Sequence, residues 1–92
     1  MANTQEILTQ TIHSLFEDAK VYILDPREDG IHLEAHVISD AFEGLSLLKR
    51  HQKVMSALKD HFNTFLHALA LKTFTWEEWK QKQNEEALWK TN

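Results

Sequence analysis

The side chains best suited to chemistry in this sequence are its six histidines, since the chain contains no cysteine. Without cysteine there is no thiolate nucleophile, no disulfide framework and no cysteine-based zinc site. A neutral imidazole can give one nitrogen to a metal ion, and the ring also changes its charge near neutral pH. The side chains of this protein can therefore contribute imidazole and carboxylate ligands, but no thiolate.

Two histidines, His32 and His36, stand four residues apart in a segment where apolar and polar residues alternate. In a β-strand both rings would lie on one face, about 13 Å apart at about 3.3 Å per residue. That distance is too long for both rings to bind one ion. The sequence has no pair of histidines four apart on a predicted helix and no His-x-His pair, so it does not predict a self-contained zinc site.

His67 stands near the start of an almost wholly apolar run, residues 65–74. Such a run is typical of a strand that is covered on both faces or nearly so. A histidine here is either a core residue bonded to a backbone carbonyl group, or an accessible ligand that gives one nitrogen to a metal supplied by a partner. The residues alone leave these two interpretations open. His51, on the apolar stripe of a predicted helix, is interpreted as a boundary residue.

The remaining polar residues form no catalytic pattern. None of the four serines stands in the context of a nucleophile elbow. The carboxylates fall on predicted helix surfaces and in the loop of residues 25–29, where solvated charge is the usual arrangement. We therefore expect no enzymatic activity.

A group of basic residues offers a different chemistry, the binding of phosphate groups. Lys49, Arg50 and Lys53 lie on one predicted helix, and Lys72 in the apolar run is a further candidate. A basic stripe on a helix is more often simply solvated. The formal net charge of −4 also argues mildly against a protein whose main task is nucleic-acid binding.

The overall composition is that of one soluble domain. The chain has 92 residues, of which 42% are hydrophobic and 26% are charged. No apolar run approaches the roughly 20 residues of a membrane span, and the first residues lack the pattern of a signal peptide. We expect a cytoplasmic protein that makes no membrane contact.

The elements that must position these residues can be predicted from periodicity and capping signals. Apolar residues at helical spacing predict a first helix from about residue 4, and strands follow at residues 20–24 and 31–39. Ser46 is expected to cap a second helix that ends before Asn63, and the strand of residues 65–74 follows. Thr75 and Glu78 have the spacing of a capping box, which starts a last helix.

The predicted order is α-β-β-α-β-α, in an α+β fold. The first two strands would form an antiparallel hairpin, and the helical crossover to the third strand implies a parallel pairing. We expect a small mixed three-stranded sheet with the helices packed on one face. Residues 1–80 would form the domain, and residues 81–92 a polar tail that is partly helical or frayed.

Three sequence blocks resemble one known family. They are Phe42-Glu-Gly-Leu-Ser-Leu-Leu-Lys-Arg-His-Gln-Lys-Val54, residues 66–75, and the Thr-x-x-Glu-Trp pattern that ends at Trp79. In this order and spacing they are similar to the BolA/IbaG family, over roughly residues 4–80. The resemblance implies a class II KH-like α+β domain, which agrees with the order predicted above.

The resemblance also implies a function and its partners. Family members bind monothiol glutaredoxins in heterodimers bridged by a [2Fe–2S] cluster, which glutathione also helps to hold, and they serve in iron–sulfur cluster trafficking and iron-status signalling. The family's C-terminal histidine ligand aligns with His67. The second ligand lies in the loop between the first two strands; residues 25–30 hold neither cysteine nor histidine, so His32 is the nearest candidate. Nitrogen ligation would raise the cluster potential.

Two other functions compete with this interpretation. Some family members are proposed to bind DNA, which would make this chain a transcriptional regulator with Lys49, Arg50, Lys53 and Lys72 on phosphates. The third hypothesis is a small structural domain that docks a protein through its exposed sheet or its last helix. The free protein is expected to be a monomer or a weak homodimer.

Overall fold

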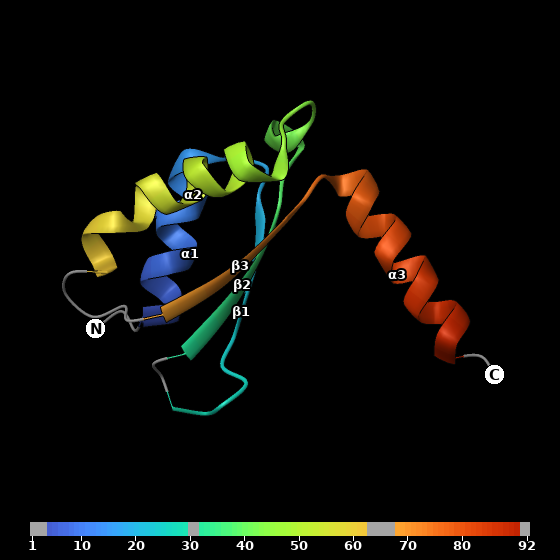
Figure 1. Cartoon of the computed structure of the whole chain (residues 1–92), viewed down its shortest axis with the longest axis horizontal. Coiled ribbons are helices and arrows are strands. Elements are labelled where there is room, and N and C mark those ends of the chain that lie inside the picture. Colours follow the sequence, from blue (N-terminus) through green and yellow to red (C-terminus); the bar gives the residue numbers. More distant parts are fainter. Residues whose placement is uncertain (1–3, 30–31, 63–67, 91–92) are drawn as a thin grey trace.

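The computed structural model describes residues 4–29, 32–62 and 68–90. Its elements follow the predicted order, with the bounds α1 Thr4–Leu15, β1 Lys20–Leu24, β2 His32–Ile38, the 3-10 turn η1 Asp40–Phe42, α2 Leu47–Phe62, β3 Ala68–Phe74 and α3 Trp76–Lys90 (Figure 1). Among the described helices none is both long and apolar enough to span a membrane.

The three strands form one mixed sheet in the order β1-β2-β3. β1 and β2 pair antiparallel, from Lys20 opposite Ile38 to Leu24 opposite Glu34. β2 and β3 pair parallel, from His32 opposite Ala68 to Ile38 opposite Phe74. The predicted hairpin and the predicted parallel crossover pairing are both confirmed. The strand β2 is therefore central, and β1 and β3 form the two edges among the described residues.

The main core lies between one face of the sheet and the helices α1 and α2. Apolar residues at helical spacing on both helices meet the alternate residues of β2 that point to this face. Phe42 of η1 closes one end of the core, and its ring makes an edge contact with Phe16, with centroids 5.0 Å apart. The buried members of this core include Leu8, Ile12, Leu33, Ala35, Val37, Val54 and Leu58.

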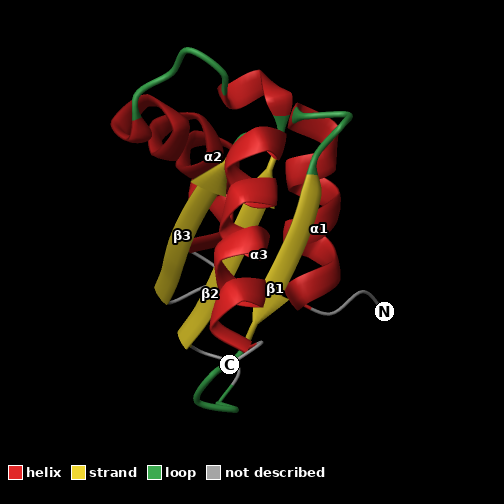
Figure 2. Ribbon diagram, turned by 90° about the vertical axis from the view of Figure 1, so that its right-hand side faces the viewer, coloured by secondary structure: helices red, strands yellow, loops and turns green. Residues whose placement is uncertain are grey.

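The helix α3 packs on the opposite face of the sheet, as Figures 1 and 2 show. The Trp79 ring stacks on Tyr22 of β1, with centroids 5.5 Å apart, and makes an edge contact with Phe74 of β3 at 5.2 Å. The prediction that the helices gather on one face is thus correct for α1 and α2 and needs correction for α3. The alternate residues of the strands present aromatic rings on this second face, and α3 covers them.

The third strand is less covered than its apolar sequence predicts. Leu71 and Thr73 are buried, whereas Ala70 and Lys72 are exposed. The expectation of a strand covered on both faces is therefore wrong for the described part of β3. The strand lies at an edge of the sheet, and α3 contacts its Phe74 end.

The predicted helix caps are present. The Ser46 hydroxyl accepts the Lys49 backbone N–H at 3.2 Å at the start of α2. In the capping box of α3, the Glu78 N–H donates to Thr75 Oγ1 at 3.1 Å, and the Thr75 N–H donates to Glu78 Oε1 at 2.8 Å. The helix α3 then continues to Lys90, through most of the segment assigned to a polar tail.

Candidate functional site

His32 is the first residue of β2 and follows the loop that joins the first two strands. Its ring nitrogen Nδ1 lies 2.7 Å from Oδ2 of Asp29, and its backbone N–H donates to Oδ1 of the same carboxylate at 2.9 Å. The loop itself is held by Asp25, whose side chain accepts the Asp29 N–H at 3.2 Å. Its Glu28 has a φ of 54°, in the left-handed region. The Asp29 carboxylate thus fixes both the backbone and the ring of His32.

This contact determines which ring nitrogen is presented for ligation. A neutral imidazole that donates its Nδ1 hydrogen to Asp29 carries its lone pair on Nε2. Metal-binding histidines commonly donate their second nitrogen to a carboxylate in this way, which orients the ring and raises its basicity. The His32 side chain is 46% exposed, so the ring is open to solvent. The chemistry of this residue fits a metal ligand.

The strand register places His32 opposite Ala68 at one end of the sheet. Ala68 is the covalent neighbour of His67. His67 itself lies outside the described residues. Within the part of the chain that the structure describes, no group of three or more histidine and acidic residues could hold a metal ion.

The basic residues predicted to contact phosphate are not brought together as one surface. Lys49 and Lys53 are exposed one turn apart on α2, beside a depression of about 450 Å³ that Leu45, Gln52 and Ser56 also line. Lys72 is exposed on β3, and its Nζ lies 3.3 Å from Glu34 on the face of the sheet that α3 partly covers. Lys72 thus belongs to a different surface from the two lysines of α2.

Arg50, the remaining predicted phosphate contact, is buried, with 6% of its surface exposed. Its Nη1 and Nη2 donate to the two carboxylate oxygens of Glu78 at 2.7 and 3.3 Å, and its Nε donates to the Leu45 carbonyl oxygen at 3.0 Å. The Arg50 guanidinium lowers the pKa of Glu78, and the Thr75 backbone N–H adds to this effect. The structure gives Arg50 a structural role, joining α2 to α3.

A family model for the BolA-like protein matches residues 18–78, which is more than half of the chain. The chain belongs to the BolA-like family. It is 38% identical over 60 residues to the DNA-binding transcriptional regulator BolA of Vibrio cholerae, covering 65% of this chain and 57% of that protein. It is 29% identical over 87 residues to the DNA-binding transcriptional regulator BolA of Escherichia coli, covering 87% of this chain and 83% of that protein.

Solved structures of this family have the same fold. BolA1 from Arabidopsis thaliana superposes with a TM-score of 0.76 at 28% identity, covering 85% of this chain and 98% of that one. A BolA homologue from Coxiella burnetii superposes with a TM-score of 0.71 at 36% identity, covering 87% and 99%. The resemblance to the family and the predicted α+β, class II KH-like order of elements are confirmed.

In this BolA-like chain, several residues of the matching blocks serve the scaffold. Phe42 is buried in the core, and Gly44 has a φ of +75°, which a residue without a Cβ adopts at low cost. Arg50 and Glu78 come from two separate blocks and form one ion pair. Several residues of the blocks that resemble the family therefore serve to join the turn η1, α2 and α3.

Two residues that organise the structure, Asp29 and Asp18, were not predicted from the sequence. Asp29 was treated as a solvated loop charge, although an aspartate three residues before a histidine at a turn was an available signal. Asp18 accepts the Ser39 hydroxyl at 2.6 Å, the Asp40 N–H at 2.8 Å and Trp76 Nε1–H at 3.3 Å. The Ser39 hydrogen bond is the main cause that lowers the pKa of Asp18. These partners lie far along the chain, so no local pattern pointed to Asp18.

Proposed function

We propose that this BolA-like protein is an adaptor in iron–sulfur cluster trafficking and iron-status signalling, without catalytic turnover of its own. It would bind a monothiol glutaredoxin through a shared [2Fe–2S] cluster, with His67 and His32 as the imidazole ligands from this chain. Because the chain contains no cysteine, the thiolate ligands would come from glutaredoxin and glutathione.

The observation that carries this proposal is the 2.7 Å contact between Asp29 and His32. It supports a His32 ring that donates Nδ1–H to a carboxylate and keeps its Nε2 lone pair for a metal, an arrangement common among ligating histidines. The pairing of His32 with Ala68 supports a second contribution from the adjoining residue, His67. Imidazole ligation would give the cluster a higher reduction potential than thiolate ligation alone.

Reconstitution tests this proposal directly. The protein is mixed with a monothiol glutaredoxin, glutathione, iron and sulfide, and the product is followed by sedimentation and visible circular dichroism. We expect a heterodimer whose spectrum differs from that of the glutaredoxin homodimer. His67→Ala and His32→Ala should each shift that spectrum, whereas His13→Ala, on the exposed surface of α1, should not. An unchanged spectrum for either ligand variant would remove that residue from the site.

A second candidate function is DNA binding, as a transcriptional regulator. It is favoured by the names of the Vibrio cholerae and Escherichia coli relatives. The residues of this chain that support it are Lys49 and Lys53, which are exposed on one side of α2. Arg50 and Lys72 support it less, since both are engaged in ion pairs with carboxylates of this chain.

The salt dependence of binding tests the second function. Each phosphate contact should add about one unit to the slope of log affinity against log salt concentration. Lys49→Gln with Lys53→Gln should lower the slope by about two units, and Lys80→Gln, on the exposed side of α3, serves as the control. Binding that is undetectable or independent of salt near physiological ionic strength would exclude this function.

A further inference from the structure

One cavity lies along β1, at an edge of the sheet. It has a volume of about 500 Å³ and is lined by Val21, Tyr22, Ile23 and Leu24 of β1, together with residues of α1. Successive residues of a strand point to opposite faces of a sheet. A cavity lined by four consecutive strand residues must therefore reach the backbone edge of that strand, rather than one of its faces.

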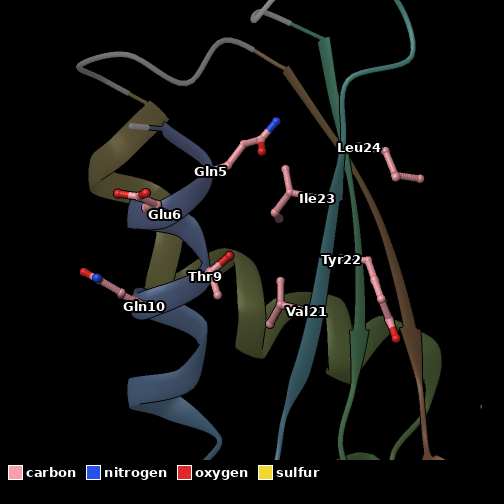
Figure 3. A pocket seen from close by; sticks show the side chains of 8 residues that line it. All are labelled: Gln5, Glu6, Thr9, Gln10, Val21, Tyr22, Ile23 and Leu24. Atoms are coloured by element: carbon pink, nitrogen blue, oxygen red, sulfur yellow. The ribbon is translucent and has the colours of Figure 1, made fainter. Parts of the chain in front are cut away.

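Figure 3 shows this alternation around the cavity. Val21 and Ile23 point towards α1, and Tyr22 and Leu24 point to the other side of the strand. From α1, Gln5 and Thr9 extend towards β1, whereas Glu6 and Gln10 point away from it. The cavity is thus a groove with the α1 side chains as one wall and the edge of β1 as its floor.

The outer edge of β1 carries backbone N–H and C=O groups that could pair with a further strand. Within the described residues β1 pairs with β2 alone, so its alternate N–H and C=O groups point outward into the groove. Natural proteins usually protect such an edge with a proline, a bulge or inward charges. The pairing of β1 with β2 runs from Lys20 to Leu24 without interruption, and Lys20 is the one charged residue in the strand.

The shape of the groove selects the kind of strand that can pair there. In Figure 2, α1 lies behind β1 and extends beyond its outer edge. A second copy of this chain would bring its own α1 to the same side, where the two helices would compete for the same space. A single extended peptide segment carries no helix layer and fits between α1 and the edge of β1.

We infer that the groove between α1 and β1 binds an extended segment of a partner protein, which adds a fourth strand to the sheet beside β1. The residues of this segment that face α1 would meet Gln5 and Thr9, and the alternate residues would pack beside Tyr22 and the exposed Leu24. The lining contains no cationic side chain, and the chain carries a net charge of −4. Both favour a basic segment, with lysine alternating with an apolar residue.

The test uses the full-length protein, labelled with nitrogen-15, and a synthetic peptide of about seven residues in which lysine alternates with valine. We expect amide shift changes concentrated in Val21–Leu24 and the first half of α1, together with nuclear Overhauser contacts between the two backbones. A peptide with N-methyl groups on the pairing edge cannot form the ladder and should not bind. A glutamate–valine peptide should bind at least about tenfold more weakly.

A matched pair of variants locates the site. Gln5→Trp fills the groove from an exposed position and should weaken peptide binding by about tenfold or more. Ser14→Trp lies on the opposite side of α1 and should leave binding unchanged.

Three results would overturn the inference. They are no shift changes in Val21–Leu24 at millimolar peptide, equal binding of the N-methylated peptide, and self-association of the free protein that Gln5→Trp abolishes. The last result would assign the groove to a second copy of the chain. Because no cluster or glutaredoxin is present in these measurements, their outcome is separate from that of the reconstitution.

Discussion

The Asp29 carboxylate contacts His32 twice, once at the backbone N–H and once at the ring. A single aspartate therefore sets both the start of β2 and the orientation of the imidazole. The same two contacts give the His32 ring a fixed orientation at the exposed end of the strand. When the His32 ring donates Nδ1–H to Asp29, the lone pair of Nε2 is left available to a metal.

Replacing Asp29 by Asn should weaken cluster binding by His32, if His32 is the ligand proposed above, while leaving the fold intact. We expect the affinity for the shared cluster to fall by about 10–100-fold, as for other carboxylates that orient a ligating histidine. The visible spectrum of the heterodimer and its rate of cluster loss measure the effect. Nitrogen-15 shifts of the His32 ring in the free protein report the tautomer independently. Glu28→Gln, in the same exposed loop, is the control; an equal effect there would discount the Asp29 contact.

The Arg50 side chain, like that of Asp29, makes several hydrogen bonds at once, and these should stabilise the fold. Replacing it by Met removes three hydrogen bonds from a buried guanidinium, two to Glu78 and one to the Leu45 carbonyl. The free energy of unfolding should fall by about 1–3 kcal/mol, since the Leu45 carbonyl then loses its partner. Urea denaturation measures the change. Lys49→Met, at the exposed neighbouring position, should stay within about 0.5 kcal/mol of the wild type. Comparable losses in both variants would contradict a special role for the Arg50 side chain.

At the scale of the elements, α3 is attached to the rest of the fold through its first turns. Trp76 reaches Asp18, Glu78 pairs with Arg50, and Trp79 packs on Tyr22 and Phe74. Lys82 adds a cation above the Phe74 ring, 5.0 Å from its centroid. The partners of α3 thus include Arg50 of α2 and aromatic residues of the sheet. The helix α3 therefore links the first turn of α2 to the second face of the sheet.

Trp79→Ala should loosen α3 more than it disturbs the core. Removal of a large ring from between Tyr22 and Phe74 should cost about 3 kcal/mol, at the lower end for such a truncation because Trp79 is only partly buried. Hydrogen exchange should accelerate in α3 while the amides of β2 keep most of their protection. Trp76→Ala, at a ring that is 37% exposed, should have a smaller effect. Uniform acceleration across the sheet would show that α3 and the core unfold together.

The junction of α2 and α3 should also make stability depend on pH. Arg50 and the Thr75 N–H lower the pKa of Glu78 below its ordinary value of 4.5. A carboxylate with a lowered pKa in the folded state stabilises the fold above its unfolded pKa, and this contribution is lost as the pH falls through the folded value. The free energy of unfolding should therefore decline in acid below about pH 4.5.

Glu78→Gln should flatten this acid decline, because the variant carries no titrating group at that position. Urea denaturation at a series of pH values measures the slope. Glu77→Gln, at the adjacent exposed position, is the control, and a flattening there equal to that of Glu78→Gln would contradict the assignment. Glu34 and Asp18 contribute in the same direction, since hydrogen bonds from His36 and Ser39, respectively, lower their pKa values.

At the scale of the whole molecule, the two candidate functions use opposite ends of the sheet. His32 begins β2, whereas α2 with Lys49 and Lys53 follows the turn η1 after the other end of β2 (Figure 1). The length of β2 separates the two ends by about 20 Å. Glutaredoxin and DNA could therefore be bound without competing for the same residues.

This separation predicts independent effects of variants at the two ends. Lys49→Gln with Lys53→Gln should weaken any DNA binding and leave the spectrum of the glutaredoxin complex unchanged. His32→Ala should have the reverse effect. Both variants are compared in electrophoretic mobility and circular dichroism measurements on the same preparations. A double-lysine variant that alters the cluster spectrum would show that the two surfaces are coupled.

Local sequence patterns were enough to predict the order of the elements, the capping of α2 by Ser46 and the capping box of Thr75 and Glu78. Each of these depends on residues within a few positions of one another, so periodicity and spacing are enough to predict them. The same is true of the hairpin of β1 and β2, whose short loop leaves little choice of pairing. The family blocks added His32 and His67 as candidate ligands, of which the structure describes the first.

Three features could not be predicted from the sequence: the face of the sheet that α3 covers, the partners of Arg50, and which lysines share a surface. These features depend on contacts between residues that lie far apart in the sequence, such as Arg50 with Glu78 or Tyr22 with Trp79. A basic residue on a helix has the same local pattern whether its charge meets solvent, phosphate or a carboxylate of another element. The groove beside β1 is likewise a property of the fold, because α1 and β1 form it together.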